Sequence, residues 1–130
     1  MNKKREVYYR GLYLIAAIFS FVSGIGFLFF YKFIFNLTAM QIPENPSYLT
    51  FSAAMMVLFG ILIFMIYKDL NNSRKIVIYA IFVKFAFAGT VLYYYLTLGS
   101  YYVGTPFLIF GAVDFIWALL FIESLRFIKK

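Results

Sequence analysis

Two charged side chains, Lys84 and Asp114, stand near the middle of long apolar stretches of this 130-residue chain. A carboxylate in such a setting is suited to holding a proton, an ion or a ligand head group, and a nearby lysine is suited to neutralising it. The chain contains no histidine and no cysteine. The commonest general base, the commonest transition-metal ligand and all thiol chemistry are therefore missing. We expect no metal ion, no cofactor and no catalytic residue, and the sequence favours a protein without enzymatic activity.

The stretches that carry these charges have the length and composition of membrane spans. Hydrophobic residues make up 65% of the chain and charged residues 13%, against about 25% charged in soluble domains. A soluble protein this small has too little interior to bury so much apolar surface. Crossing the hydrocarbon takes a helix of about 20 residues. The sequence predicts a single all-α integral membrane domain over residues 1–130, a four-transmembrane-helix bundle with spans at about 12–31, 48–67, 76–98 and 106–127.

The basic residues predict the orientation of these spans, because loops rich in lysine and arginine stay in the cytoplasm. Ten of the twelve fall in the two tails and in the loop between the second and third spans: Lys3, Lys4, Arg5, Arg10, Lys68, Arg74, Lys75, Arg126, Lys129 and Lys130. The N-terminus and the C-terminus are both predicted to be cytoplasmic. The net charge of +7 is thus explained by topology, and we expect no nucleic acid as partner.

The depths of the two buried charges predict that they form a pair. Lys84 lies eight residues, or about 12 Å, from the start of the third span at Ile76. Asp114 lies eight residues below Pro106 in the fourth span, so in a core of about 30 Å their levels differ by about 6 Å. The pair has a structural interpretation, as a tie between two helices, and a functional one, as part of a polar cavity with Trp117 one turn from Asp114. A third alternative has Lys84 reaching inward and Asp114 meeting another subunit.

Small residues let helix backbones approach closely in membranes. They flank both charges and line the first two spans, where we expect helix packing: Ala16, Ser20, Gly24, Gly60, Ala80, Ala88, Gly111 and Ala118.

Short motifs over most of the chain carry a family resemblance: Arg10-Gly11, Gly24-Ile25-Gly26 through to Lys32, Gly60, Lys84 and Asp114-Phe115-Ile116-Trp117. With these motifs the chain resembles the DoxX-like small four-helix bacterial membrane proteins. The resemblance implies a location in the bacterial cytoplasmic (inner) membrane and marks Lys84 and Asp114 as important positions. Members of that group include a quinone-linked subunit of a thiosulfate oxidoreductase. The lack of cysteine here argues against carrying that sulfur chemistry over.

Three functions are compatible with these features. The first is a non-catalytic accessory or assembly subunit of a larger membrane complex, whose partners are membrane lipids and other membrane subunits or further copies of this chain. The second is a small oligomeric transporter or channel that uses Asp114 as its membrane-embedded coupling group. The third is a DoxX-like protein that binds a lipid or a quinone.

Overall fold

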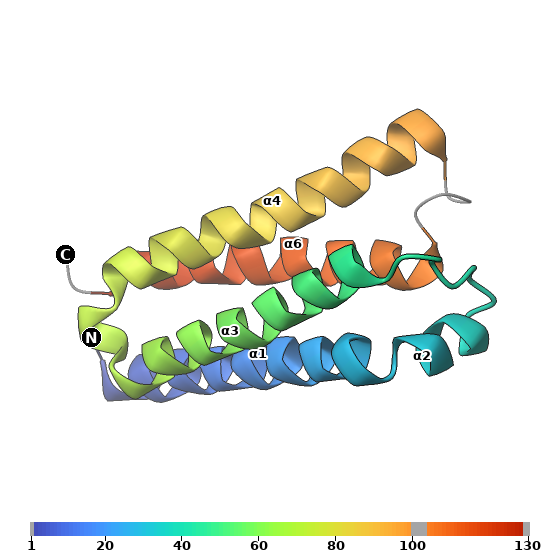
Figure 1. Cartoon of the computed structure of the whole chain (residues 1–130). Coiled ribbons are helices and arrows are strands. Elements are labelled where there is room, and N and C mark those ends of the chain that lie inside the picture. Colours follow the sequence, from blue (N-terminus) through green and yellow to red (C-terminus); the bar gives the residue numbers. More distant parts are fainter. Residues whose placement is uncertain (1, 100–103, 129–130) are drawn as a thin grey trace. The chain divides into compact units, whose positions relative to one another are not determined.

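The computed structural model describes residues 2–99 and 104–128, apart from the side chain of Thr105. In these ranges the chain is helical and contains no strand: α1 Lys3–Phe29, α2 Tyr31–Leu37, α3 Ser47–Lys68, the 3-10 turn η1 Leu70–Asn72, α4 Arg74–Leu98 and α6 Thr105–Leu125 (Figure 1). Helices α1, α3, α4 and α6 are long and apolar enough to cross a membrane. This composition is that of an integral membrane protein, and the predicted all-α class is confirmed.

The first helix is longer than its apolar stretch. It begins at Lys3, nine residues before the predicted start of the span, because the Asn2 side chain caps it by accepting a 2.9 Å hydrogen bond from the Lys4 backbone N–H. At its other end the backbone of Phe30 leaves the helical region (φ −121°, ψ 22°), and the short helix α2 follows, which the sequence analysis did not predict. Hydropathy thus marks the apolar part of the helix and not its ends.

Glycine governs the backbone on both sides of the connection between α4 and α6. Gly99 follows α4 with φ +84°, and Gly104 precedes α6 with φ +79°. Only glycine adopts these angles without strain. Pro106 lies in the first turn of α6, where its missing N–H costs no hydrogen bond. Helix α6 ends at Leu125, two residues before the predicted end of the span, and residues 126–127 form a turn.

The described contacts divide the chain into two compact units, residues 2–70 and residues 71–128. Each unit consists mainly of one pair of long helices, α1 with α3 and α4 with α6. The two pairs are described separately below. Assembly of both into one four-helix bundle stays a prediction.

The first helix pair is antiparallel and packs closely through two glycines. A Cβ added to Gly24 of α1 would lie 2.8 Å from the carbonyl oxygen of Ala53 and 2.8 Å from the backbone nitrogen of Val57, both in α3. A Cβ on Gly60 of α3 would lie 3.1 Å from the carbonyl oxygen of Ala17 in α1. Backbone therefore lies against backbone at both points, as the small residues predict.

These contacts define a packing face on each helix. Ala17 and Gly24 are seven residues apart in α1, as are Ala53 and Gly60 in α3. Seven residues complete almost two turns and return to nearly the same side of a helix. The contact face of α1 therefore includes Gly24 from the predicted stripe, together with Ala17. The other two members of that stripe, Ala16 and Ser20, are buried as well.

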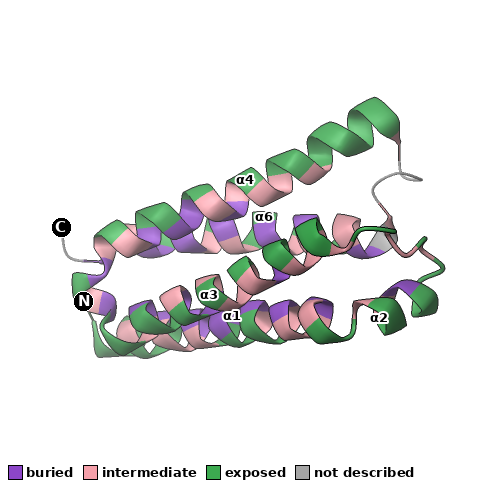
Figure 2. Ribbon diagram, in the orientation of Figure 1, coloured by how far each residue is buried: buried purple, intermediate pink, exposed green. Residues whose placement is uncertain are grey.

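The second helix pair is also antiparallel. Phe85 of α4 meets Phe115 of α6 edge-to-face, with ring centroids 5.9 Å apart. A Cβ added to Gly111 of α6 would lie 3.0 Å from the Val91 side chain of α4, so this glycine also permits a close approach. Toward the C-terminal end of α4 the two helices diverge (Figure 1). From Leu92 to Leu98 the residues of α4 are exposed (Figure 2).

Candidate functional site

The two charges within the spans are bonded to each other. Lys84 Nζ, on α4, donates a 2.8 Å hydrogen bond to Asp114 Oδ1, on α6. The exposed fractions of the two side chains are 4% and 12%. The structure thus brings together the two residues that the depth argument pairs. Their role as a functional site stays a prediction.

Small side chains allow this direct contact. Ala80 lies one turn before Lys84 on α4, Ala118 lies one turn after Asp114 on α6, and neither has measurable exposure. Because neither alanine extends beyond its Cβ, the two backbones can lie close enough for a direct bond. Ala88, on the other side of Lys84, is half-buried and borders the groove described below.

The direct bond between Lys84 and Asp114 connects α4 to α6. A lysine ammonium has three N–H donors and a carboxylate accepts at both oxygens, so the bond satisfies part of each group and neutralises their charges. A buried pair of this kind contributes little net stability, because the cost of removing both charges from water offsets their attraction. In the described ranges, no three His, Cys, Asp or Glu side chains form a group that would hold a metal ion.

Trp117 lies one turn after Asp114 and packs along its own helix. Its ring centroid is 6.1 Å from that of Phe121, with the planes tilted by 36°. Its indole Nε1 is buried and has no hydrogen-bond partner in the part of the chain that the structure describes. The geometry therefore gives Trp117 a packing contact with Phe121.

A groove runs between α4 and α6 on the side of the ion pair toward the α4 C-terminus. Its volume is about 430 Å³, within the usual range of about 300–1,000 Å³ for ligand pockets. Apart from the Tyr95 hydroxyl, its side chains are apolar: Phe85, Ala88, Gly89, Val91, Leu92, Tyr95, Leu108, Gly111, Ala112 and Phe115. Sequence reasoning missed this groove, although four of these residues are glycine or alanine at one level of the two helices.

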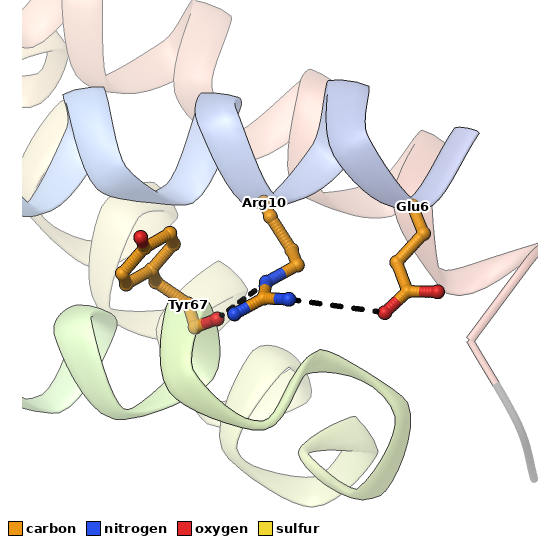
Figure 3. Close-up of polar contacts among 3 residues, drawn as sticks. All are labelled: Glu6, Arg10 and Tyr67. Atoms are coloured by element: carbon orange, nitrogen blue, oxygen red, sulfur yellow. Dashed lines mark hydrogen bonds and ion pairs between the residues drawn. The ribbon is translucent and has the colours of Figure 1, made fainter. Parts of the chain in front are cut away.

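An arginine ties the ends of the first pair. Arg10 Nε, near the start of α1, donates a 3.1 Å hydrogen bond to the carbonyl oxygen of Tyr67 in the last turn of α3 (Figure 3). Its guanidinium also lies 5.2 Å from the centre of the Tyr67 ring and 4.0 Å from a Glu6 carboxylate oxygen. A cation in this place satisfies a carbonyl that the helix leaves unpaired and complements the helix dipole.

Another arginine does the same in the second pair. Arg74, the first residue of α4, donates to the carbonyl oxygens of Leu125 and Ile128, at 2.7 and 3.2 Å, where α6 ends. Neither cap was predicted from the sequence, where Arg10 and Arg74 served to orient the spans and Arg10 also formed part of the family resemblance. The sequence holds a pattern related to these caps: in each helix pair, small residues stand seven and fourteen positions before the capped carbonyl. They are Gly60 and Ala53 before Tyr67, and Ala118 and Gly111 before Leu125.

No protein-family model, no curated protein and no solved structure matches this chain. The resemblance to DoxX-like proteins therefore stays a prediction based on its short motifs.

Proposed function

We propose that this chain is a non-catalytic accessory or assembly subunit of a larger complex in the cytoplasmic membrane of a bacterium. The observation that carries the proposal is the direct bond between Lys84 and Asp114, the two charges placed in the middle of spans. Both side chains are buried, and they contact each other directly. A pair so placed serves to hold α4 against α6, which a subunit needs in order to present a fixed surface.

The residues available for chemistry support the same proposal. The chain has neither histidine nor cysteine, and a buried lysine–aspartate pair alone provides few of the acids and bases that catalysis uses. The two arginine caps serve the helices themselves, since each bonds to carbonyl oxygens at the end of a neighbouring helix. The structure thus favours a helical scaffold over an enzyme.

The geometry around Asp114 does not meet the requirements of the transporter alternative. A coupling carboxylate must be reachable by its ion or proton and must exchange partners during transport. Asp114 is buried and accepts a hydrogen bond from Lys84 at 2.8 Å. We therefore propose the accessory role in place of the transporter.

We further propose that all four long helices cross the membrane and that both termini lie in the cytoplasm. Four crossings return the chain to the side from which it starts. The basic residues of the tails and of the connection between α3 and α4 then lie on the cytoplasmic side, as the positive-inside rule requires. The two arginine caps, near the start of α1 and the start of α4, would lie at that same boundary.

The experiment is purification of the tagged chain from its native membrane in a mild detergent, with quantitative mass spectrometry of the proteins that accompany it. The proposal predicts one or more larger membrane proteins in a fixed ratio to the chain. A tagged, unrelated four-span protein expressed at the same level is the control for hydrophobic contamination. Recovery of the chain alone or with copies of itself only, in detergents that preserve other complexes of the same membrane, would contradict the proposal.

A further inference from the structure

The wall of the groove along α4 is about as long as one leaflet of a bilayer is thick. Along α4 it extends from Phe85 to Tyr95, ten residues that span about 15 Å at 1.5 Å per residue. The hydrocarbon core of a bilayer is about 30 Å thick, so one leaflet accounts for about 15 Å. The groove therefore has the length that an extended acyl chain needs to reach from the membrane surface to the midplane.

The two ends of the groove differ in the way that such a ligand requires. At the inner end, the Phe85 and Phe115 rings meet edge-to-face and line the groove next in sequence to the buried ion pair. At the outer end lies Tyr95, preceded by Tyr93 and Tyr94, all three of them exposed. Tyrosines gather where hydrocarbon meets head groups. The inner end of the groove is therefore apolar, and its outer end is amphipathic.

We propose that this groove binds one acyl chain of a phospholipid, with the head group at the level of Tyr95 and the end of the chain against Phe85 and Phe115. Its walls are apolar side chains, and both helices are candidate membrane spans, so a lipid chain can enter sideways from the bilayer. The bound chain would lie along the groove between the two helices. This lipid site does not depend on the accessory role, and either can fail without the other.

Gly89 offers a way to fill the groove without disturbing the protein. It lines the groove, and a Cβ added to it meets no other atom within 4 Å, so a phenylalanine there would point into space that the ligand needs. Gly11 is a matched control, because it also lies in a long helix and an added Cβ there meets nothing within 4 Å. Both substitutions remove a glycine from a helix and so change helix propensity alike.

The test is titration of the delipidated full chain with dioleoyl phosphatidylcholine in detergent, followed by native mass spectrometry. We expect one tightly bound lipid for the unmodified chain and for Gly11→Phe, and at least tenfold weaker binding for Gly89→Phe. Equal binding by all three proteins, or binding by none of them, would overturn the proposal. A lipid-free dimeric mass that is lost in Gly89→Phe would assign the groove to a second copy and would overturn it too.

A thiol label tests the same lipid site independently, and it remains informative if Gly89→Phe fails to fold. The chain has no cysteine, so Gly89→Cys carries a single thiol. We expect a lipid-soluble maleimide to label it in the lipid-free monomer, and added dioleoyl phosphatidylcholine to slow labelling at least tenfold. Protection of the thiol without lipid would show that the rest of the chain covers the groove, and labelling unaffected by lipid would show an empty groove. Either result would refute the lipid site.

Discussion

Replacing Lys84 and Asp114 singly and together tests how the ion pair contributes to stability. At 2.8 Å and an effective dielectric constant of about 20, the two charges attract each other by about 6 kcal/mol. Burial opposes this attraction, since removing each ion from water costs several kcal/mol. The two effects nearly cancel, so the intact pair is expected to contribute little. Removing one partner leaves the other charge buried alone, which costs about 3–5 kcal/mol.

We therefore expect Lys84→Met and Asp114→Leu each to lower the free energy of unfolding by about 3–5 kcal/mol, and the double variant to lie close to the unmodified chain. The assay is reversible unfolding in mixed micelles. Trp117, the single tryptophan of the chain and one turn from Asp114, is the fluorescent reporter. Single variants as stable as the unmodified chain would refute the buried pair. A double variant that loses the sum of the two single effects would refute the compensation between burial and attraction.

Three further predictions concern helix packing, helix capping and topology. Gly24→Leu is expected to lower the free energy of unfolding by at least about 1–3 kcal/mol, because its Cβ would lie 2.8 Å from α3 backbone atoms. Gly11→Leu, where the added Cβ has room, is the control and should be neutral in the same unfolding assay. Equal effects of the two substitutions would contradict the close contact at Gly24. Arg74→Met is expected to lower the free energy of unfolding by about 1.5–3 kcal/mol, because its hydrogen bonds to the end of α6 are lost. Lys75→Met removes the same charge from an exposed neighbour and should lower it much less. Equal losses in the two variants would show that charge alone matters. Single cysteines added at either terminus are expected to resist an impermeant maleimide in intact cells and to react once the cells are opened, and labelling of either one in intact cells would contradict the proposed orientation.

Much of this structure was predictable because a bilayer imposes strong rules on sequence. An apolar run of about 20 residues has few alternatives to a helix in lipid, so all four long helices were expected. The pairing of Lys84 with Asp114 was predicted from the span limits, the rise per residue and the thickness of the core, because these place the two opposite charges at similar depth. Gly24 and Gly60 were expected as packing residues because a missing side chain matters most where backbones touch.

The features that were missed depend on details that composition does not show. Helix α1 extends to Lys3 because polar residues outside the membrane remain helical when capped, and hydropathy has no signal there. The roles of Arg10 and Arg74 as caps depend on which helix end lies beside them, and a count of positive charge does not contain that information. The groove depends on the angle between α4 and α6 as well as on the small residues that line it, and the sequence does not give that angle.

The central claim is that the Lys84–Asp114 pair is structural and that the chain serves a larger membrane complex. The most direct test places the Lys84→Met, Asp114→Leu double variant in the native membrane and measures both recovery of the accompanying proteins and activity of their complex. The claim predicts that partners and activity are retained at the level of the unmodified chain. A double variant that unfolds normally in micelles and still binds its partners, but leaves their complex inactive, would show that the two charges take part in the chemistry and would contradict the claim.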